Sequence, residues 1–149
     1  MTPVVVPIEL RWGDQDPYGH VNNVAVLRIL EEARARAFWS PPEPAEPHQV
    51  FPPLDPDQPV WALVSDVELK YLRQLPYQRE PVIVEMSIPH VGGASFVIDY
   101  ALKCDAADPA PRVTAKSTLV MVDRISGRPQ RLDAGLRRQL LEYRPDSVG

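Results

Sequence analysis

One long helical pattern near the N-terminus constrains the fold of this chain most. Between Asn22 and Ser40, apolar residues recur at the spacing of one helix face, and charged residues gather on the other face. Asn22 or Asn23 can cap the start, because an asparagine side chain accepts a hydrogen bond from the free amides of the first turn. Ser40 precedes two prolines, and a residue before proline is pushed out of the helical region. The apolar face is wide and includes small alanines, which favours a helix wrapped by a sheet.

Most of the remaining apolar residues alternate with polar ones, which is typical of strands. The second strand has one clearly polar face, as expected where one side of a sheet meets water. Short turns join most of the later segments, and links of hairpin length cannot make parallel crossovers. A short last helix begins after Asp133, which can cap it. The fold class is therefore predicted to be α+β, with a five-stranded antiparallel sheet and strands at residues 4–11, 61–71, 82–88, 96–102 and 114–122.

Many of the 18 prolines lie between Pro41 and Pro59. Proline fixes φ and removes a backbone donor, so this stretch is neither a helix interior nor a central strand. The segment before it is too short to form a stable hydrophobic core of its own. We therefore interpret residues 1–149 as a single domain with a proline-rich loop at about 41–59. Such a loop is either functional or a simple connector, and both interpretations stay open.

Composition excludes several classes of function. The formal net charge is −4 and gives no electrostatic reason to expect a nucleic-acid partner. Charges interrupt the apolar runs, so no membrane span is predicted, and the N-terminus lacks the features of a signal peptide. The single cysteine, Cys104, excludes an internal disulfide and is expected to act as a small buried hydrophobe. A cytoplasmic protein without a membrane partner is predicted.

The candidate chemistry lies in residues 11–23, Arg-Trp-Gly-Asp-Gln-Asp-Pro-Tyr-Gly-His-Val-Asn-Asn. Two carboxylates, Asp14 and Asp16, precede a turn, and His20 and a helix start follow. The first amides of a helix carry partial positive charge and can stabilise an oxyanion. A carboxylate near that carbonyl carbon can attack it or deprotonate a water. The alternative from the residues alone is structural: aspartates in a turn, an asparagine cap and a hydrogen-bonded histidine.

This segment, followed by Leu-Glu-Glu-Ala-Arg in the helix, closely resembles the hot-dog-fold thioesterases of the 4-hydroxybenzoyl-CoA thioesterase family. The resemblance extends over essentially the whole chain, because strand, helix and four further strands is the hot-dog order. It implies a sheet that wraps around the helix and two protomers that pair to complete each active site. It also implies hydrolysis of an acyl thioester.

The resemblance assigns roles to several residues of the motif. It places the catalytic carboxylate on Asp16 and the amide that polarises the carbonyl on Asn23. In plant acyl-carrier-protein thioesterases, the histidine that corresponds to His20 belongs to the proposed catalytic set, together with an asparagine where this chain has Tyr18. We therefore expect His20 to orient the site or assist proton transfer, and Tyr18 and Gly19 to contact substrate.

Residues outside the motif add weaker candidates. Ser95, just after two glycines, is predicted to contact the thioester, since glycine allows close approach of a ligand; a turn residue is the alternative. Arg73, Arg79 and Arg112 lie near strand ends and can bind phosphates of coenzyme A, or simply face solvent. Asp14 is interpreted as structural.

The sequence as a whole predicts an acyl-CoA thioesterase that releases free acid and coenzyme A. Its partners would be a small-molecule acyl-CoA and a second copy, in a homodimer or a dimer-of-dimers tetramer. No cofactor is expected, since coenzyme A enters as part of the substrate, and no histidine pair has the spacing of metal ligands. The alternatives are a thioesterase for acyl carrier proteins and a non-catalytic module that binds acyl thioesters.

Overall fold

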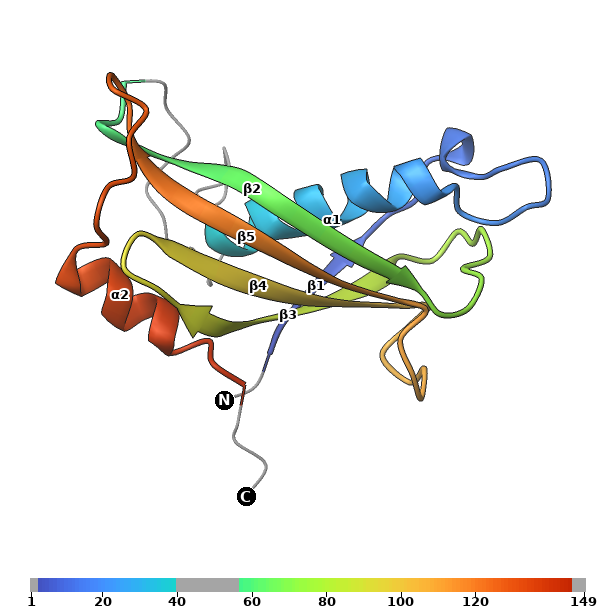
Figure 1. The fold of residues 1–149 in the computed structure, drawn as a ribbon. Coiled ribbons are helices and arrows are strands. Elements are labelled where there is room, and N and C mark those ends of the chain that lie inside the picture. Colours follow the sequence, from blue (N-terminus) through green and yellow to red (C-terminus); the bar gives the residue numbers. More distant parts are fainter. Residues whose placement is uncertain (1–2, 40–56, 146–149) are drawn as a thin grey trace.

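The computed structural model describes residues 3–39 and 57–145. Five strands form one antiparallel sheet that packs against a long helix (Figure 1). Most of the predicted proline-rich loop lies outside the described residues. The elements in chain order are β1 (Val4–Ile8), the short 3-10 helix η1 (Trp12–Asp14), α1 (Asn23–Phe38), β2 (Val60–Tyr71), β3 (Val82–Val91), β4 (Ser95–Lys103), β5 (Val113–Asp123) and α2 (Ala134–Leu141).

The strand order across the sheet is β1-β3-β4-β5-β2, and every neighbouring pair is antiparallel. The predicted fold class is confirmed. The first strand is shorter than predicted, because the backbone leaves the sheet after Ile8 and turns into η1. The other predicted strands lie within one to three residues of the observed ones.

The core lies between α1 and the inner face of the sheet. Buried residues alternate with half-buried ones along most of β3 and β4, as the two-residue period of a strand requires. The buried stripe of α1 includes Ala33 and Ala37, whose small side chains permit close packing. The helix packs mainly over β1 and β3, near one edge of the sheet.

Strand β2 forms the other edge, and it is exposed on both faces over much of its length. The prediction of one dry face for this strand is wrong. Within the described residues β2 pairs only with β5. Helix α1 packs mainly over β1 and β3, near the other edge of the sheet. Apolar side chains therefore remain in contact with solvent, with exposed fractions of 50% at Leu63, 42% at Val64 and 52% at Tyr71.

Helix α2 packs beside β3 at the end of the sheet far from the start of α1 (Figure 1). The Asp133 side chain accepts a hydrogen bond from the Leu136 amide at 2.8 Å, which confirms the predicted cap. Leu140 is fully buried, and the rings of Phe38 and Tyr143 meet edge to face at 5.4 Å. Neither helix in the described part of the chain is long and apolar enough to cross a membrane.

Candidate active site

Asp14, the first carboxylate of the motif, is buried in a cluster of charges. Its carboxylate accepts from the Arg11 amide at 2.7 Å, from the Arg11 guanidinium at 3.0 Å and from Arg28 at 2.7 Å. Burial by itself raises the pKa of this carboxyl group, but the hydrogen bonds from Arg11 and Arg28 outweigh it and lower the pKa below 3.8. The Asp14 carbonyl also accepts from the Asn22 amide at 2.7 Å. Asp14 therefore anchors the segment that precedes α1, in agreement with a structural role.

Asp16, the second carboxylate, shapes a tight turn and stays half-buried. Its Oδ1 accepts from the amides of Tyr18 at 2.8 Å and His20 at 3.1 Å. Gly19 closes the turn with φ of 80°, a conformation that favours glycine, and its amide donates to the Asp16 carbonyl. The second carboxylate oxygen, Oδ2, makes no hydrogen bond with the described residues. One oxygen thus holds the turn, and the other remains available for chemistry.

The start of α1 follows directly. Of the two predicted caps, Asn22 is the one used, since its side chain accepts from the Val24 amide at 2.9 Å. Asn23 is the first helical residue, and its amide has no hydrogen-bond acceptor in the described part of the chain. That N–H lies at the positive end of the helix dipole, where an anionic oxygen is stabilised.

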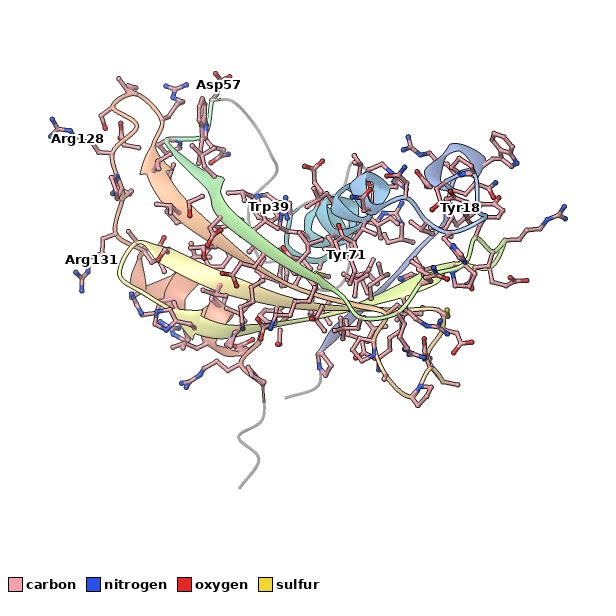
Figure 2. The ribbon with its side chains drawn as sticks, turned by 45° about the vertical axis from the view of Figure 1, so that its right-hand side comes forward. Tyr18, Trp39, Asp57, Tyr71, Arg128 and Arg131 are labelled. Carbon is pink, nitrogen blue, oxygen red and sulfur yellow. The ribbon has the colours of Figure 1, made fainter. Side chains whose placement is uncertain are left out.

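Residues 75–77, which follow β2, form backbone hydrogen bonds with this turn. The Val21 amide donates to Leu75 at 2.7 Å, and the Tyr77 amide donates to Gly19 at 2.9 Å. The Tyr71 hydroxyl, at the end of β2, donates to the Asn23 carbonyl at 3.0 Å. These bonds fix the turn and the helix start to one end of the sheet, where Figure 2 shows Tyr18 on the loop before α1.

Tyr71 is the residue that sequence reasoning missed as part of the site. Its contact with Asn23 joins residues 48 positions apart, and nothing in the local pattern of the strand signals it. The sequence shows only that Tyr71 ends a predicted strand, and this position by itself does not indicate a contact with the site. A contact of this kind depends on where the strand end lies in space.

Two of the three arginines predicted to bind coenzyme A, Arg73 and Arg112, form ion pairs with Asp108. Arg73 and Arg112 donate to the two oxygens of Asp108, at 2.9 and 3.0 Å. These hydrogen bonds, from Arg112 first and then Arg73, hold the pKa of Asp108 well below its ordinary value. Arg112 also donates to the Gln74 carbonyl, so the cluster ties the loop before β5 to the residues after β2. Phosphate binding by Arg73 stays a prediction, and it would have to compete with Asp108; Arg79 is exposed.

Ser95 lies at the wrong end of the sheet for a contact within one chain. It begins β4 and pairs with Val120. The turn and the helix start lie near the other end, where Leu102 pairs with Val113 and Val113 pairs with Tyr71. The structure therefore does not bring Ser95 to Asp16 of the same protomer.

The arrangement suits acyl transfer. One short segment carries both a half-buried carboxylate, whose Oδ2 accepts from no described residue, and a helix amide with no acceptor among those residues. A base or nucleophile and an oxyanion donor are what attack on a carbonyl carbon needs. Residues 3–39 and 57–145 contain no group of three or more side chains suited to hold a metal ion.

Comparison with known families agrees with this chemistry. Residues 10–140 match the model of the thioesterase-like superfamily. The chain belongs to this superfamily. A search of curated proteins gives no significant match.

Solved structures similar to this superfamily member share its fold. A Pseudomonas aeruginosa protein matches with a TM-score of 0.74 and 22% identity, over 96% of this chain and 92% of that one. The YbaW protein of Escherichia coli, described as a probable thioesterase, matches with a TM-score of 0.72 and 21% identity, over 93% and 97%. A Thermus thermophilus thioesterase, complexed with coenzyme A and Zn, matches with a TM-score of 0.71 and 26% identity, over 97% of both chains. The predicted hot-dog thioesterase family is confirmed, and thioester hydrolysis is supported as the general activity.

Proposed function

We propose that this protein hydrolyses acyl-CoA thioesters to a free acid and coenzyme A. The observation that carries the proposal is the Asp16 turn, in which backbone amides bind one carboxylate oxygen and no described residue donates to the other. The same segment leads into α1, whose first amide, at Asn23, has no acceptor among the described residues. The superfamily match and the likeness to a thioesterase complexed with coenzyme A support the choice of substrate.

In the proposed reaction the thioester carbonyl accepts a hydrogen bond from the Asn23 N–H. A preformed donor of this kind contributes about 10²- to 10³-fold to the rate of acyl transfer. The free oxygen of Asp16 either attacks the carbonyl carbon, to form a mixed anhydride that water then cleaves, or takes a proton from the attacking water. In both routes the carbon–sulfur bond breaks, and the coenzyme A sulfur leaves with a proton that His20 can supply.

We also infer that the active protein is a homodimer joined through the edges of β2. The strand is 12 residues long, pairs with only one neighbour in the described part of the chain, and exposes apolar side chains. An edge of this length invites pairing with another strand unless it is protected. Sedimentation equilibrium tests this inference directly, and a monomer at all concentrations would contradict it.

The test of function replaces Asp16 with asparagine, which keeps the shape of the side chain but removes the charge. Turnover of an acyl-CoA should fall about 10³-fold, because asparagine is neither a base nor a nucleophile. Asp123→Asn is the matched control, since Asp123 also accepts two backbone amides in a turn, at 2.8 and 3.0 Å. Release of free thiol measures turnover, and circular dichroism confirms folding.

The result that contradicts the proposal is a folded Asp16→Asn protein with unchanged turnover. Matched thioesters of coenzyme A and of an acyl carrier protein, tested on the unaltered protein, decide which carrier it prefers. A protein that binds acyl-CoA yet hydrolyses no thioester of any chain length would be a binding module instead.

A further inference from the structure

Arg34, on α1, carries a charge that no described carboxylate neutralises at close range. Its side chain is only 14% exposed, and the nearest carboxylate among the described residues, that of Glu31, lies 3.9 Å from Nη2. Glu31 itself is 75% exposed, so water and salt screen its charge. A largely buried guanidinium without a close anion costs free energy, and an anionic ligand would offset that cost.

A neutral contact fixes the direction of the Arg34 guanidinium. Its Nη1 donates to the Tyr100 hydroxyl at 3.1 Å, and that hydroxyl lies 2.5 Å from Ser117 Oγ. Tyr100 and Ser117 are both buried. Because the Tyr100 hydroxyl accepts from Arg34, its own proton is directed to Ser117. A guanidinium has five N–H donors, and the other four of Arg34 meet no acceptor in the described part of the chain.

Arg34 lies on one side of α1 with residues that lead back to the candidate active site. Val24, Leu27, Glu31 and Arg34 are three or four positions apart, which places them in one row along the helix. Val24 and Leu27 are exposed apolar side chains. Asn23, whose amide is the candidate oxyanion donor, begins the helix beside them. An acyl chain along this row would run from the thioester over apolar side chains to the guanidinium.

Strand β2 carries a second exposed row that starts at the same place. Tyr71, its last residue, donates to the first residue of α1, and Val67 is an exposed apolar residue four positions earlier on the same face. Val67 pairs with Ser117, whose hydroxyl contacts that of Tyr100. Helix and strand therefore both connect the thioester position with the residues that hold Arg34.

The helix sets the length of acyl group that would reach the guanidinium. Helical side chains lean toward the N-terminus, and the contact with Glu31 shows that the Arg34 guanidinium lies about one turn back from its own backbone. Asn23 and Glu31 are eight positions apart, which is a rise of about 12 Å along the helix axis. An extended acyl chain of medium length spans this distance.

We propose that Arg34 binds a carboxylate at the far end of the acyl group, so that the preferred substrate is the coenzyme A half-thioester of a dicarboxylic acid. The inference deepens the proposed function and rests on it. The paired N–H donors of a guanidinium match the two oxygens of a carboxylate. Hydrolysis then releases a dicarboxylic acid and coenzyme A. Arg34 is a binding residue for this substrate, and Tyr100 is a positioning residue that orients it.

The first experiment compares two acyl-CoA thioesters of equal chain length, one ending in a carboxylate and the other in a methyl group. The unaltered protein should show a kcat/KM at least about 10-fold higher for the carboxylate-ended thioester, as expected for charged hydrogen bonds. In Arg34→Gln the ratio of the two kcat/KM values should fall to about one or below, because those bonds are lost. Release of free thiol measures both rates over a series of chain lengths.

A neighbouring ion pair on α1 provides matched controls. Arg36→Gln removes the same charge from the exposed pair with Glu32, and the ratio should keep its unaltered value. Glu31→Gln should raise the ratio, because it removes the carboxylate that competes for Arg34. Glu32→Gln removes an acidic charge from the next position and should leave the ratio unchanged.

Two further variants keep the test decisive if Arg34→Gln impairs folding. Tyr100→Phe keeps Arg34 but removes the hydroxyl that orients it, so the ratio should fall part of the way. Arg34→Met replaces the guanidinium with an apolar side chain and should reverse the preference in favour of the methyl-ended thioester. Circular dichroism and urea denaturation show which variants are folded.

The outcomes separate this inference from the function on which it rests. If the unaltered protein hydrolyses neither thioester, the proposed function fails and this inference fails with it. If it hydrolyses both and the kcat/KM for the carboxylate-ended thioester is equal or lower, only the carboxylate site is wrong. Folded Arg34→Gln or Arg34→Met proteins that keep the unaltered preference, with a lower free energy of unfolding, would show that Arg34 is structural and overturn the proposal.

Discussion

Asp16 and Asp123 begin two turns that are built in the same way at opposite ends of the molecule. In each, Oδ1 accepts two backbone amides, at 2.8 and 3.1 Å for Asp16 and at 2.8 and 3.0 Å for Asp123. In each, a glycine of positive φ, Gly19 at 80° or Gly127 at 72°, donates its amide to the aspartate carbonyl. The local hydrogen bonds give no ground for assigning chemistry to one turn and not to the other.

The Asp16 and Asp123 turns differ in the elements that surround them. The Asp16 turn leads into α1, whose first amide has no acceptor among the described residues, and residues 75–77 hold it in place. The Asp123 turn leads into a short hairpin and is followed by exposed residues. A carboxylate bound in a turn is therefore a common structural device, and the neighbouring helix start is what makes one of them suitable for acyl transfer.

The largest expected effect on stability concerns the anchor beneath the Asp16 turn. Asp14→Asn removes the charge that pairs with Arg11 and Arg28, and it should lower the free energy of unfolding by about 2 kcal/mol. Turnover should fall as well, because the turn loses its attachment. Urea denaturation measures the first effect, and release of free thiol measures the second.

The control for this variant is Glu32→Gln, which breaks an exposed ion pair with Arg36. Surface pairs on one helix contribute about 0.5 kcal/mol or less, so this variant should behave almost like the unaltered protein. Equal losses in the two variants would show that Asp14 is no more important than a surface charge.

The next prediction compares the same substitution at the glycines of the two turns, and its expected effect on stability is smaller. Alanine at Gly19 or Gly127 would meet no atom within 4 Å, so its cost comes from the positive φ alone. Each substitution should lower the free energy of unfolding by about 1 kcal/mol. Only Gly19→Ala should also reduce turnover, because it displaces Asp16. Comparable losses of turnover in both variants would contradict the distinction between the two turns.

The smallest expected effect concerns how the free energy of unfolding depends on pH. The backbone hydrogen bond from Ser126 is the main cause that lowers the pKa of Asp123 below 3.8. A carboxyl group with a lowered folded-state pKa stabilises the protein above its unfolded pKa, and this contribution is lost as pH falls through the folded value. Asp123→Asn should therefore lose less stability than the unaltered protein does as the pH falls below about 4. Parallel curves of unfolding free energy against pH would contradict this.

Much of the fold and part of the site follow from short-range patterns. The α1 periodicity, its asparagine cap and the proline signal after Ser40 predict the helix, which ends at Phe38. Alternating residues predict β3, β4 and β5 within three residues at each end. The Asp-Pro-Tyr-Gly turn at Asp16 is similarly local, since its hydrogen bonds join residues at most four positions apart. These features depend on neighbours in the chain, which a sequence displays directly.

The tertiary structure alone decided what surrounds that turn. It placed Tyr71 on the start of α1, engaged Arg73 and Arg112 with Asp108, and put Ser95 at the far end of the sheet. It also left β2 as an edge with two exposed faces, although its alternating pattern predicts one dry face. The physical reason is the same in each case: strand order and long-range contacts determine which side chains meet, and a one-dimensional pattern does not specify either. The sequence by itself determined the helix, the strands and the Asp16 turn, and the fold decided which of two similar aspartate turns lies beside the start of α1.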